Sequence, residues 1–529
     1  MTVAAKIRSL DVTATQLDGN GIADFVWPLS WRDHAQFRDN LLSGYAAVIR
    51  AGFARGDEDS DLLAILAMEF IQEAMRGWFV ATLLSRFAQR GETITAPWLR
   101  GGASDDPATW QAQRDRLSFL RGRFPSSGWR SLLRPAYGLL QGSELSWRWP
   151  QTVDFRSRII ATNPCKLTCR RAGHEQEKPV LVSLRHWFGD ACDSLPTDLS
   201  PLALRPETVD AVMTVIADAA IASGEQAPNA QLAHLRSWLI EASATTRWYL
   251  RWLNNHPRRL PARLWTGSGG YIFRRILHMA VRRNGGTCWS HDHGSGVGLF
   301  DICDTNLTEF VTPDTFVTFS SIQAQGYQTQ RHEAFRMAPS WPTIEAAPKP
   351  AGEPQRQVPA ATVGMGKTIL FLANQYRGEK VSLTPIEFDF VAADWQARLF
   401  SRLRALGYEV LMRAHPESPS LPPGGIGAPL AGGPFSEALA RADMVIMDYL
   451  HTTVLKDILF SGKPVLTFEF GHCPPNAVAA DALARRIRFI PGWYDEDNRA
   501  HTDWSALSSA IDDARGMAAD QAFVSLFEV

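Results

Sequence analysis

Arg413, His415 and Pro416 directly follow an apolar run at 408–412 in the last third of the chain. An arginine fork and an imidazole can both donate hydrogen bonds to phosphate oxygens, and the proline ends the extended segment. A buried parallel strand reads as a continuous apolar run, and open α/β sheets bind ligands beyond the carboxyl ends of such strands. These three residues therefore predict a phosphate-binding cluster at the edge of a parallel sheet.

A second apolar run, 443–447, is followed by four polar residues: Asp448, His451, Thr452 and Thr453. The threonines stand at the start of a helix expected over 452–461. There their hydroxyls either cap the helix or bind an anion beside its free N–H groups. The two strand ends are about 35 residues apart, the spacing of a βαβ repeat. We therefore expect both clusters to face one crevice.

Candidate catalytic groups lie further upstream, in His291-Asp-His-Gly294 after a short strand at 287–290. Asp292, His291 and His293 offer a carboxylate and two imidazoles for acid, base or nucleophilic chemistry, and Glu309 is a second candidate acid or base. In an extended strand the two histidines would share a face and Asp292 would point away, whereas a loop lifts that restriction. A structural turn and a metal site are the alternatives.

The turn Gly267, Ser268 and Gly269 precedes a basic helix expected over 271–283. Backbone N–H groups of such a turn can hold an anion or an acceptor group, and a plain tight turn is the alternative. The arginine pairs at 274–275 and 282–283 suggest contact with an anionic membrane surface, or simply solvated helix faces.

The pattern of apolar residues predicts an α/β protein in two parts. Residues 1–336 form an N-terminal domain that is helix-rich over 1–260 and α/β over 261–336. A Pro- and Ala-rich linker spans 337–363, and residues 364–529 form a C-terminal domain. Strands expected at 368–373, 408–412, 443–447 and 464–468 alternate with helices at 394–406, 435–441 and 452–461. This alternation is typical of a doubly wound parallel sheet.

Composition excludes several classes of protein. A net charge of -1 over 529 residues shows no excess of basic residues of the kind that favours nucleic-acid binding. No apolar run is long enough to span a bilayer, and the first residues lack the apolar core of a signal peptide. The six cysteines have no convincing zinc spacing, which favours reduced thiols. We expect a cytoplasmic protein, with peripheral contact at the inner membrane left open.

Residues 366–475 resemble the donor half of GT-B glycosyltransferases that build bacterial surface polysaccharides. The resemblance rests on His415-Pro416, on the run Asp443–Val454 and on Gly462–Leu466. In several of these enzymes an HP motif and a Ser/Thr pair hold the nucleotide phosphate. The pattern is similar to CMP-sugar users such as sialyltransferases and Kdo transferases. It is also similar to CDP-glycerol glycerophosphotransferases, in which an Asp-Tyr-Ser-Ser-like run occupies this place.

Residues 263–320 resemble the acceptor half of retaining β-Kdo transferases of lipopolysaccharide and capsule assembly. The two resemblances together imply a GT-B-like fold of two Rossmann-like domains facing a cleft, with a largely helical N-terminal elaboration. They imply transfer of Kdo or a related nonulosonic acid from a CMP-linked donor to a saccharide or lipid-linked saccharide acceptor in O-antigen or capsule synthesis.

By this resemblance Asp292 is the nucleophile, and His291 or His293 handles the acceptor proton or the charge of the departing donor. We expect no metal and no cofactor, because a single donor phosphate suits one compact cluster of Arg413, His415, Thr452 and Thr453. The alternatives are a polyol-phosphate transferase of the CDP-glycerol type and a non-catalytic protein that binds a nucleotide or a polysaccharide.

Overall fold

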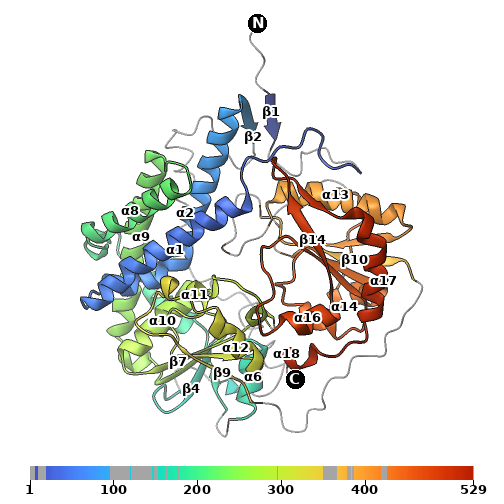
Figure 1. The fold of residues 1–529 in the computed structure, drawn as a ribbon. Helices are drawn as coiled ribbons and strands as arrows, with labels where there is room; N and C mark the ends of the chain where they lie inside the picture. Colours follow the sequence, from blue (N-terminus) through green and yellow to red (C-terminus); the bar gives the residue numbers. More distant parts are fainter. Residues whose placement is uncertain are drawn as a thin grey trace.

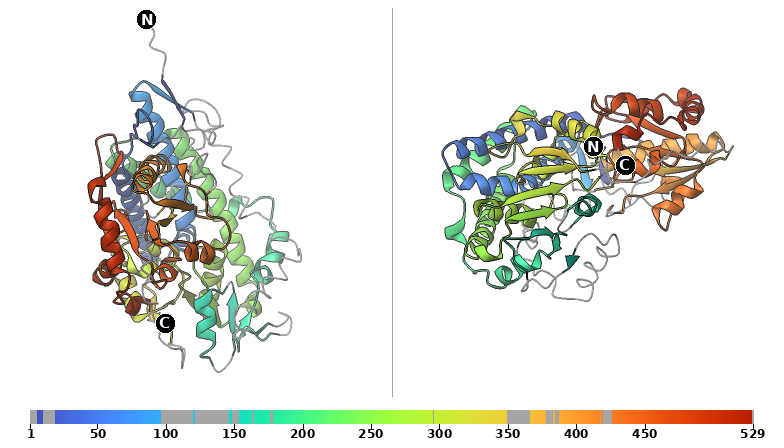
Figure 2. Two further views of the ribbon diagram at one scale, coloured as in Figure 1. Left: turned by 90° about the vertical axis from the view of Figure 1, so that its right-hand side faces the viewer. Right: turned by 90° about the horizontal axis from the view of Figure 1, so that it is seen from below.

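The fold is α/β with two large sheets rich in parallel pairs, seen in a computed structural model (Figure 1). A third, two-stranded sheet pairs β1 (Lys6–Ser9) with β2 (Glu92–Thr95) in parallel. The structure describes residues 6–9, 19–95, 120, 146–147, 153–348 except 163, 176–177 and 295, then 366–377, 383, 387–416, 418 and 426–527. The view from below in Figure 2 separates two lobes, each built around one sheet. We call them the N-terminal lobe and the C-terminal lobe.

The sheet of the N-terminal lobe has seven strands, and every adjacent pair is parallel. In spatial order they are β3 (Ser146–Trp147), β5 (Val180–Leu181), β4 (Ile159–Thr162), β6 (Arg263–Thr266), β7 (Thr287–His291), β8 (Thr315–Thr318) and β9 (Thr343–Ala346). After β4 the chain adds β5 on one side and later β6 on the other. The order therefore reverses between β4 and β6, which is where open α/β sheets form a ligand crevice.

The C-terminal lobe has a six-stranded sheet in which only the last strand is antiparallel. Its spatial order is β11 (Glu409–Arg413), β10 (Thr368–Leu372), β12 (Met444–Met447), β13 (Val465–Glu469), β14 (Arg488–Tyr494) and β15 (Ala500–Thr502). The strands β10, β12 and β13 are buried because their apolar runs are covered on both faces. The order of this sheet reverses between β10 and β12.

Four long helices cover one side of the N-terminal lobe: α1 (Trp31–Ala54), α2 (Asp59–Gln89), α8 (Pro206–Ala222) and α9 (Asn229–Asn254) (Figure 1). Helix α1 begins with a capping box in which Ser30 accepts from the Asp33 amide and the Asp33 side chain accepts from the Ser30 amide. It then packs against α2 and α8, while α2 packs against α9.

A segment near each end of the chain contacts the lobe at the opposite end of the sequence. Near the start, the Ile22 amide donates to Asp394 Oδ1 at 2.7 Å, and the ring of Trp27 stacks on Phe390 of the C-terminal lobe. Near the end, the carbonyl oxygen of Leu526 in α18 (Val524–Phe527) accepts from Ser320 Oγ at 2.8 Å. Residues 19–29, which we call the N-terminal strap, and α18 therefore cross between the lobes.

The observed elements change three expectations from the sequence. Strands β3, β4 and β5 lie within 1–260, so the sheet starts well before residue 261. Strand β9 lies inside the expected linker of 337–363, of which 349–363 falls outside the described residues. Helix α15 spans Leu455–Leu459, so it begins three residues after the expected start at 452. Within the described residues, no helix has the length and apolar character needed to cross a bilayer.

Candidate functional site

A cavity of about 890 Å³ lies between the two lobes, and the residues that follow the strands of both sheets line it. We call it the interdomain cleft. Most of the candidate side chains predicted from the sequence line this cleft: Ser268, Asp292, His293, Glu309, Arg413, His415, Pro416, His451, Thr452 and Thr453. Gly267 lines it as well. The structure thus brings the candidate catalytic residues of one sheet together with the candidate phosphate-binding residues of the other.

Asp292 is the first residue after β7, and its carboxyl group is almost completely buried in the cleft wall. The Tyr327 hydroxyl donates to Oδ2 at 2.8 Å, and the Gly294 amide donates to Oδ1 at 2.8 Å. Burial raises the pKa of Asp292 to about 7, against the opposing effects of His293 and of these two hydrogen bonds. A carboxyl with this pKa is present in both protonation states near neutral pH.

Glu309 holds the glycine-rich turn after β6 in place. Its Oε1 accepts from the Ser268 hydroxyl at 2.6 Å, and its Oε2 accepts from the Gly269 amide at 2.7 Å. The Gly270 amide donates to Ser268 Oγ at 3.2 Å. The anion bound by the Gly269 amide is therefore the carboxylate of Glu309. This arrangement replaces the predicted backbone cradle for a ligand.

The two histidines that flank Asp292 differ in position. The side chain of His293 is 53% exposed, lines the cleft and places Nδ1 4.0 Å from Glu309 Oε1. The His291 ring is buried and does not line the cleft, and its Nδ1 donates to the Thr266 carbonyl oxygen at 2.7 Å. Burial lowers the pKa of His291 to about 3. The predicted proton-transfer role therefore fits His293, whereas His291 lies away from the cleft.

Arg413 ends β11 and supplies the guanidinium on the opposite wall. Its Nη1 donates to the Ala431 carbonyl oxygen at 2.7 Å, and it forms no ion pair with a carboxylate among the described residues. A cleft residue whose cation has no acidic partner is suited to bind an anionic ligand. His415 and Pro416 follow it in the lining of the same wall.

Thr452 and Thr453 lie in the loop before α15 and are not its caps, because Val454 takes the N-cap position. Thr452 lines the cleft, and the side chain of Thr453 approaches the backbone of the other lobe. A Cβ at Gly294 would lie 3.2 Å from Thr453 Cγ2. The backbone at Gly294 therefore lies close to the opposite lobe.

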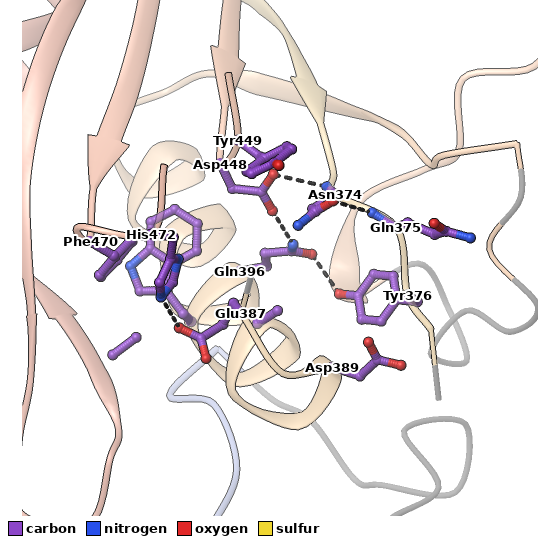
Figure 3. A pocket seen from close by; sticks show the side chains of 13 residues that line it. Asn374, Gln375, Tyr376, Glu387, Asp389, Gln396, Asp448, Tyr449, Phe470 and His472 are labelled. Atoms are coloured by element: carbon purple, nitrogen blue, oxygen red, sulfur yellow. Dashed lines mark hydrogen bonds and ion pairs between the residues drawn. The ribbon is translucent and has the colours of Figure 1, made fainter. Parts of the chain in front are cut away.

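Asp448 lies in a smaller neighbouring pocket of the C-terminal lobe (Figure 3). Its Oδ1 accepts from the Asn374 amide at 2.9 Å, and its Oδ2 accepts from Gln396 Nε2 at 2.7 Å. The Tyr376 hydroxyl in turn donates to Gln396 Oε1 at 2.7 Å. Asp448 thus fixes the segment after β10, and that segment lines the cleft. Both oxygens of the Asp448 carboxyl group accept hydrogen bonds from these donors.

Three residues that line the cleft were not predicted as part of the site. Tyr327 lies on α12 (Ser321–Thr329), 35 residues beyond the carboxyl group that it contacts. Arg274 and Tyr271 belong to the basic helix segment that the sequence did reveal, and α10 spans Ile272–Arg283. Their positions in the cleft depend on how α10 packs against the sheet, which the local pattern does not specify.

Comparisons with known proteins add no family assignment. A scan against models of protein families gives no match, and a search of curated protein sequences returns no relative. Among the residues that the structure describes, no group of three or more His, Cys, Asp or Glu side chains is arranged to hold a metal ion.

Proposed function

We propose that this protein is a GT-B-type glycosyltransferase that moves a sugar from a nucleotide-activated donor to a saccharide acceptor. The observation that carries the proposal is a cavity between two sheets rich in parallel pairs. One wall carries a carboxyl group of raised pKa, and the other carries an arginine that forms no ion pair with a carboxylate of the described residues. Group transfer needs both features, because a donor must be held by its leaving group while a reactive group meets the sugar.

The C-terminal lobe is proposed to hold the donor phosphate through Arg413 and the neighbouring His415 and Thr452. These three line the cleft beyond β11 and β12, on either side of β10 in the sheet. The arginine fork offers directed hydrogen bonds to phosphate oxygens and favours the charge that builds up as the leaving group departs. One compact cluster suits a donor with a single phosphate, and CMP-linked Kdo or a related nonulosonic acid is the donor class that we propose.

Asp292 is proposed as the reacting group of the N-terminal lobe. Its ionised carboxylate attacks the anomeric carbon, and the bond between that carbon and the phosphate oxygen breaks, with the electron pair leaving on CMP. An acceptor hydroxyl then displaces the carboxylate and gives its proton to a base, for which exposed His293 is suitably placed. Two displacements at one carbon retain its configuration.

The proposal is tested by incubating the protein with CMP-Kdo, CMP-sialic acid or CDP-glycerol and measuring nucleotide release. We expect CMP release from a CMP-sugar. Arg413→Gln should raise the donor Kd by about tenfold or more, because it removes one or two charge-assisted hydrogen bonds. Release of CMP from CDP-glycerol alone would identify a polyol-phosphate transferase. Binding of CMP without turnover of any donor would refute the enzyme proposal.

A further inference from the structure

Helix α10 carries four arginines, and three of them pair with a carboxylate on a neighbouring element. The pairs are Arg275 with Glu69, Arg282 with Asp314 and Arg283 with Asp61. Arg274 alone forms no ion pair with a carboxylate of the described residues. The difference is sharpest between Arg274 and Arg275, which are adjacent in sequence. The pairing of Arg282 and Arg283 also gives these two residues a role within the protein.

Arg274 lies in the wall of the interdomain cleft, on the side of the N-terminal lobe. Its Nη1 donates to the Ser268 carbonyl oxygen, and its Nε is buried without a hydrogen-bond partner. Glu309 acts on the guanidinium through its charge, but no ion pair forms, and both of its oxygens accept from the Ser268–Gly269 turn. Burial lowers the pKa of Arg274. The cleft therefore contains a partly desolvated cation with an incomplete set of partners.

Removing a guanidinium from water without a close counter-charge is unfavourable, and proteins usually compensate such a charge by pairing. The neighbouring arginines follow that rule. The unpaired cation of Arg274 is therefore best explained by an anion that occupies the cleft when a ligand is bound. This site differs from the proposed phosphate cluster, because Arg413 belongs to the opposite lobe.

Tyr271 supplies an aromatic surface beside this cation. It is the N-cap residue of α10, its side chain is 42% exposed, and it lines the same cavity. The guanidinium carbon of Arg274 lies 5.9 Å from the centre of its ring. Aromatic faces pack against the apolar face of a sugar ring, so this pair offers one surface for a ring and one donor group for a charge.

We propose that Arg274 and Tyr271 form a subsite for an anionic sugar, in which the guanidinium binds a carboxylate or phosphate group and the tyrosine ring supports the sugar ring. The inference rests on the proposed function and assigns a binding subsite to the charged group of one of its substrates. The charged group belongs either to the donor sugar or to the acceptor saccharide. Both sources present the same chemistry to Arg274, and the experiment separates them.

The test measures binding of glucuronate, glucose 6-phosphate and uncharged glucose to the full-length protein by ligand-observed NMR or calorimetry. At least one anionic sugar should bind about tenfold or more tightly than glucose, as expected for a charge-assisted contact. Arg274→Gln should remove this preference, and Tyr271→Ala should weaken binding of the same sugar. Arg274→Lys, which keeps the charge without the planar fork, should retain part of the preference.

Arg282→Gln is the matched control, since it removes the same charge from the same helix outside the cleft. Equal binding of all three sugars to the native protein, or equal effects of Arg274→Gln and Arg282→Gln, would overturn the subsite. Competition of the bound anionic sugar with CMP-sialic acid but not with CMP assigns the charge to the donor sugar. Simultaneous binding with CMP-sialic acid assigns it to the acceptor. CMP binding is measured in parallel, so a failure of the donor proposal is recognised independently.

Discussion

At the scale of single residues, the state of the Asp292 carboxyl is set by the balance between burial and hydrogen bonding. Burial favours the protonated form, whereas the Tyr327 hydroxyl and the Gly294 amide favour the carboxylate. The resulting pKa of about 7 leaves a substantial ionised fraction at neutral pH while keeping the group more basic than an exposed aspartate. Two predictions follow from this balance.

Asp292→Asn should reduce glycosyl transfer by about a thousandfold or more, because the amide is a poor nucleophile and base. In the native protein, kcat/KM should rise as the pH passes through about 7 and then level off, as the carboxyl loses its proton. Steady-state transfer assays between pH 5.5 and 8.5 measure both effects. CMP binding serves as the control and should persist in Asp292→Asn. Transfer at the native rate by this variant would eliminate Asp292 as the reacting group.

Tyr327→Phe tests whether the tyrosine positions Asp292 and tunes its charge. Loss of the hydroxyl removes a hydrogen bond to the ionised form, so the pKa of Asp292 should rise further. The rise of kcat/KM should move to higher pH, with much of the activity recovered in alkaline buffer. A uniform loss of activity at every pH, without a shift, would indicate that Tyr327 has only a packing role.

At the scale of elements, the position of Tyr327 depends on close contact between α12 and the 3-10 turn Val297–Leu299. A Cβ at Gly326 would lie 1.9 Å from the Gly298 carbonyl oxygen and 2.8 Å from Asn476 Nδ2. Asn476 belongs to the C-terminal lobe and donates to Gly298 O at 2.9 Å. The glycine therefore allows a helix, a turn and the opposite lobe to meet beside the cleft.

Gly326→Ala should lower the free energy of unfolding by about 3 kcal/mol, since the added methyl group forces the contact apart. Gly516→Ala is the control in helix α17 (Leu507–Met517), where nothing lies within 4 Å of the added Cβ. It should stabilise the protein by about 0.5 kcal/mol. Urea denaturation measures both changes, and equal effects of the two substitutions would contradict the close-contact explanation.

The smaller pocket of Figure 3 should make stability depend on pH through Glu387. Burial raises its pKa to about 7, so between its usual value and pH 7 the folded protein keeps a proton that the unfolded chain releases. Stability from this group is therefore lost as pH rises through that window. Glu387→Gln should remove this loss. It should raise the free energy of unfolding by about 3 kcal/mol at pH 8 and by almost nothing near pH 4.5.

Thermal unfolding at several pH values measures this difference. The control is Glu207→Gln, because Glu207 is 69% exposed and should show no such trend. A constant difference between Glu387→Gln and the native protein across the range would show that Glu387 is ionised in the folded state at acidic pH as well.

The accuracy of the sequence predictions also varies with the type of element. Strands β10 to β13 lie within one residue of their predicted bounds, because a continuous apolar run covered on both faces has clear ends. The run 179–184 also favours a strand and contains β5, whereas the two-residue strand β3 carries too few residues for any periodicity. The start of the N-terminal sheet was therefore placed too late. Likewise, the role of Glu309 as the anchor of a turn 40 residues earlier comes from tertiary packing alone.

At the scale of the whole molecule, one continuous hydrophobic core joins the helical layer to the C-terminal sheet. Trp27 of the N-terminal strap lies at the junction, with its ring centre 5.5 Å from Phe388, 5.4 Å from Phe390 and 6.4 Å from Phe79 of α2. No sequence pattern in 19–29 indicated this placement, since Phe388 and Phe390 lie more than 300 residues away in the chain. The prediction of two lobes was confirmed only at the level of two parallel-rich sheets.

Trp27→Ala should lower the free energy of unfolding by about 4 kcal/mol, because it leaves a cavity at the junction of the two lobes. The same loss of packing should weaken the coupling between the lobes. In calorimetry the native protein should unfold in one main transition and the variant in two. Trp493→Ala is the matched control, as Trp493 is 50% exposed, and should leave the profile almost unchanged. A single transition in Trp27→Ala at the native temperature would contradict this account.

The crossing of the N-terminal strap has a consequence for biosynthesis. Ile22 and Trp27 leave the ribosome early, but their partners Phe390 and Asp394 are translated more than 360 residues later. At elongation rates of about 5–20 residues per second, the strap waits on the order of 20 seconds or more before the C-terminal lobe can cover its apolar side chains. Holding chaperones should therefore bind nascent chains at this segment. The chaperones should dissociate only when the last third of the protein has emerged.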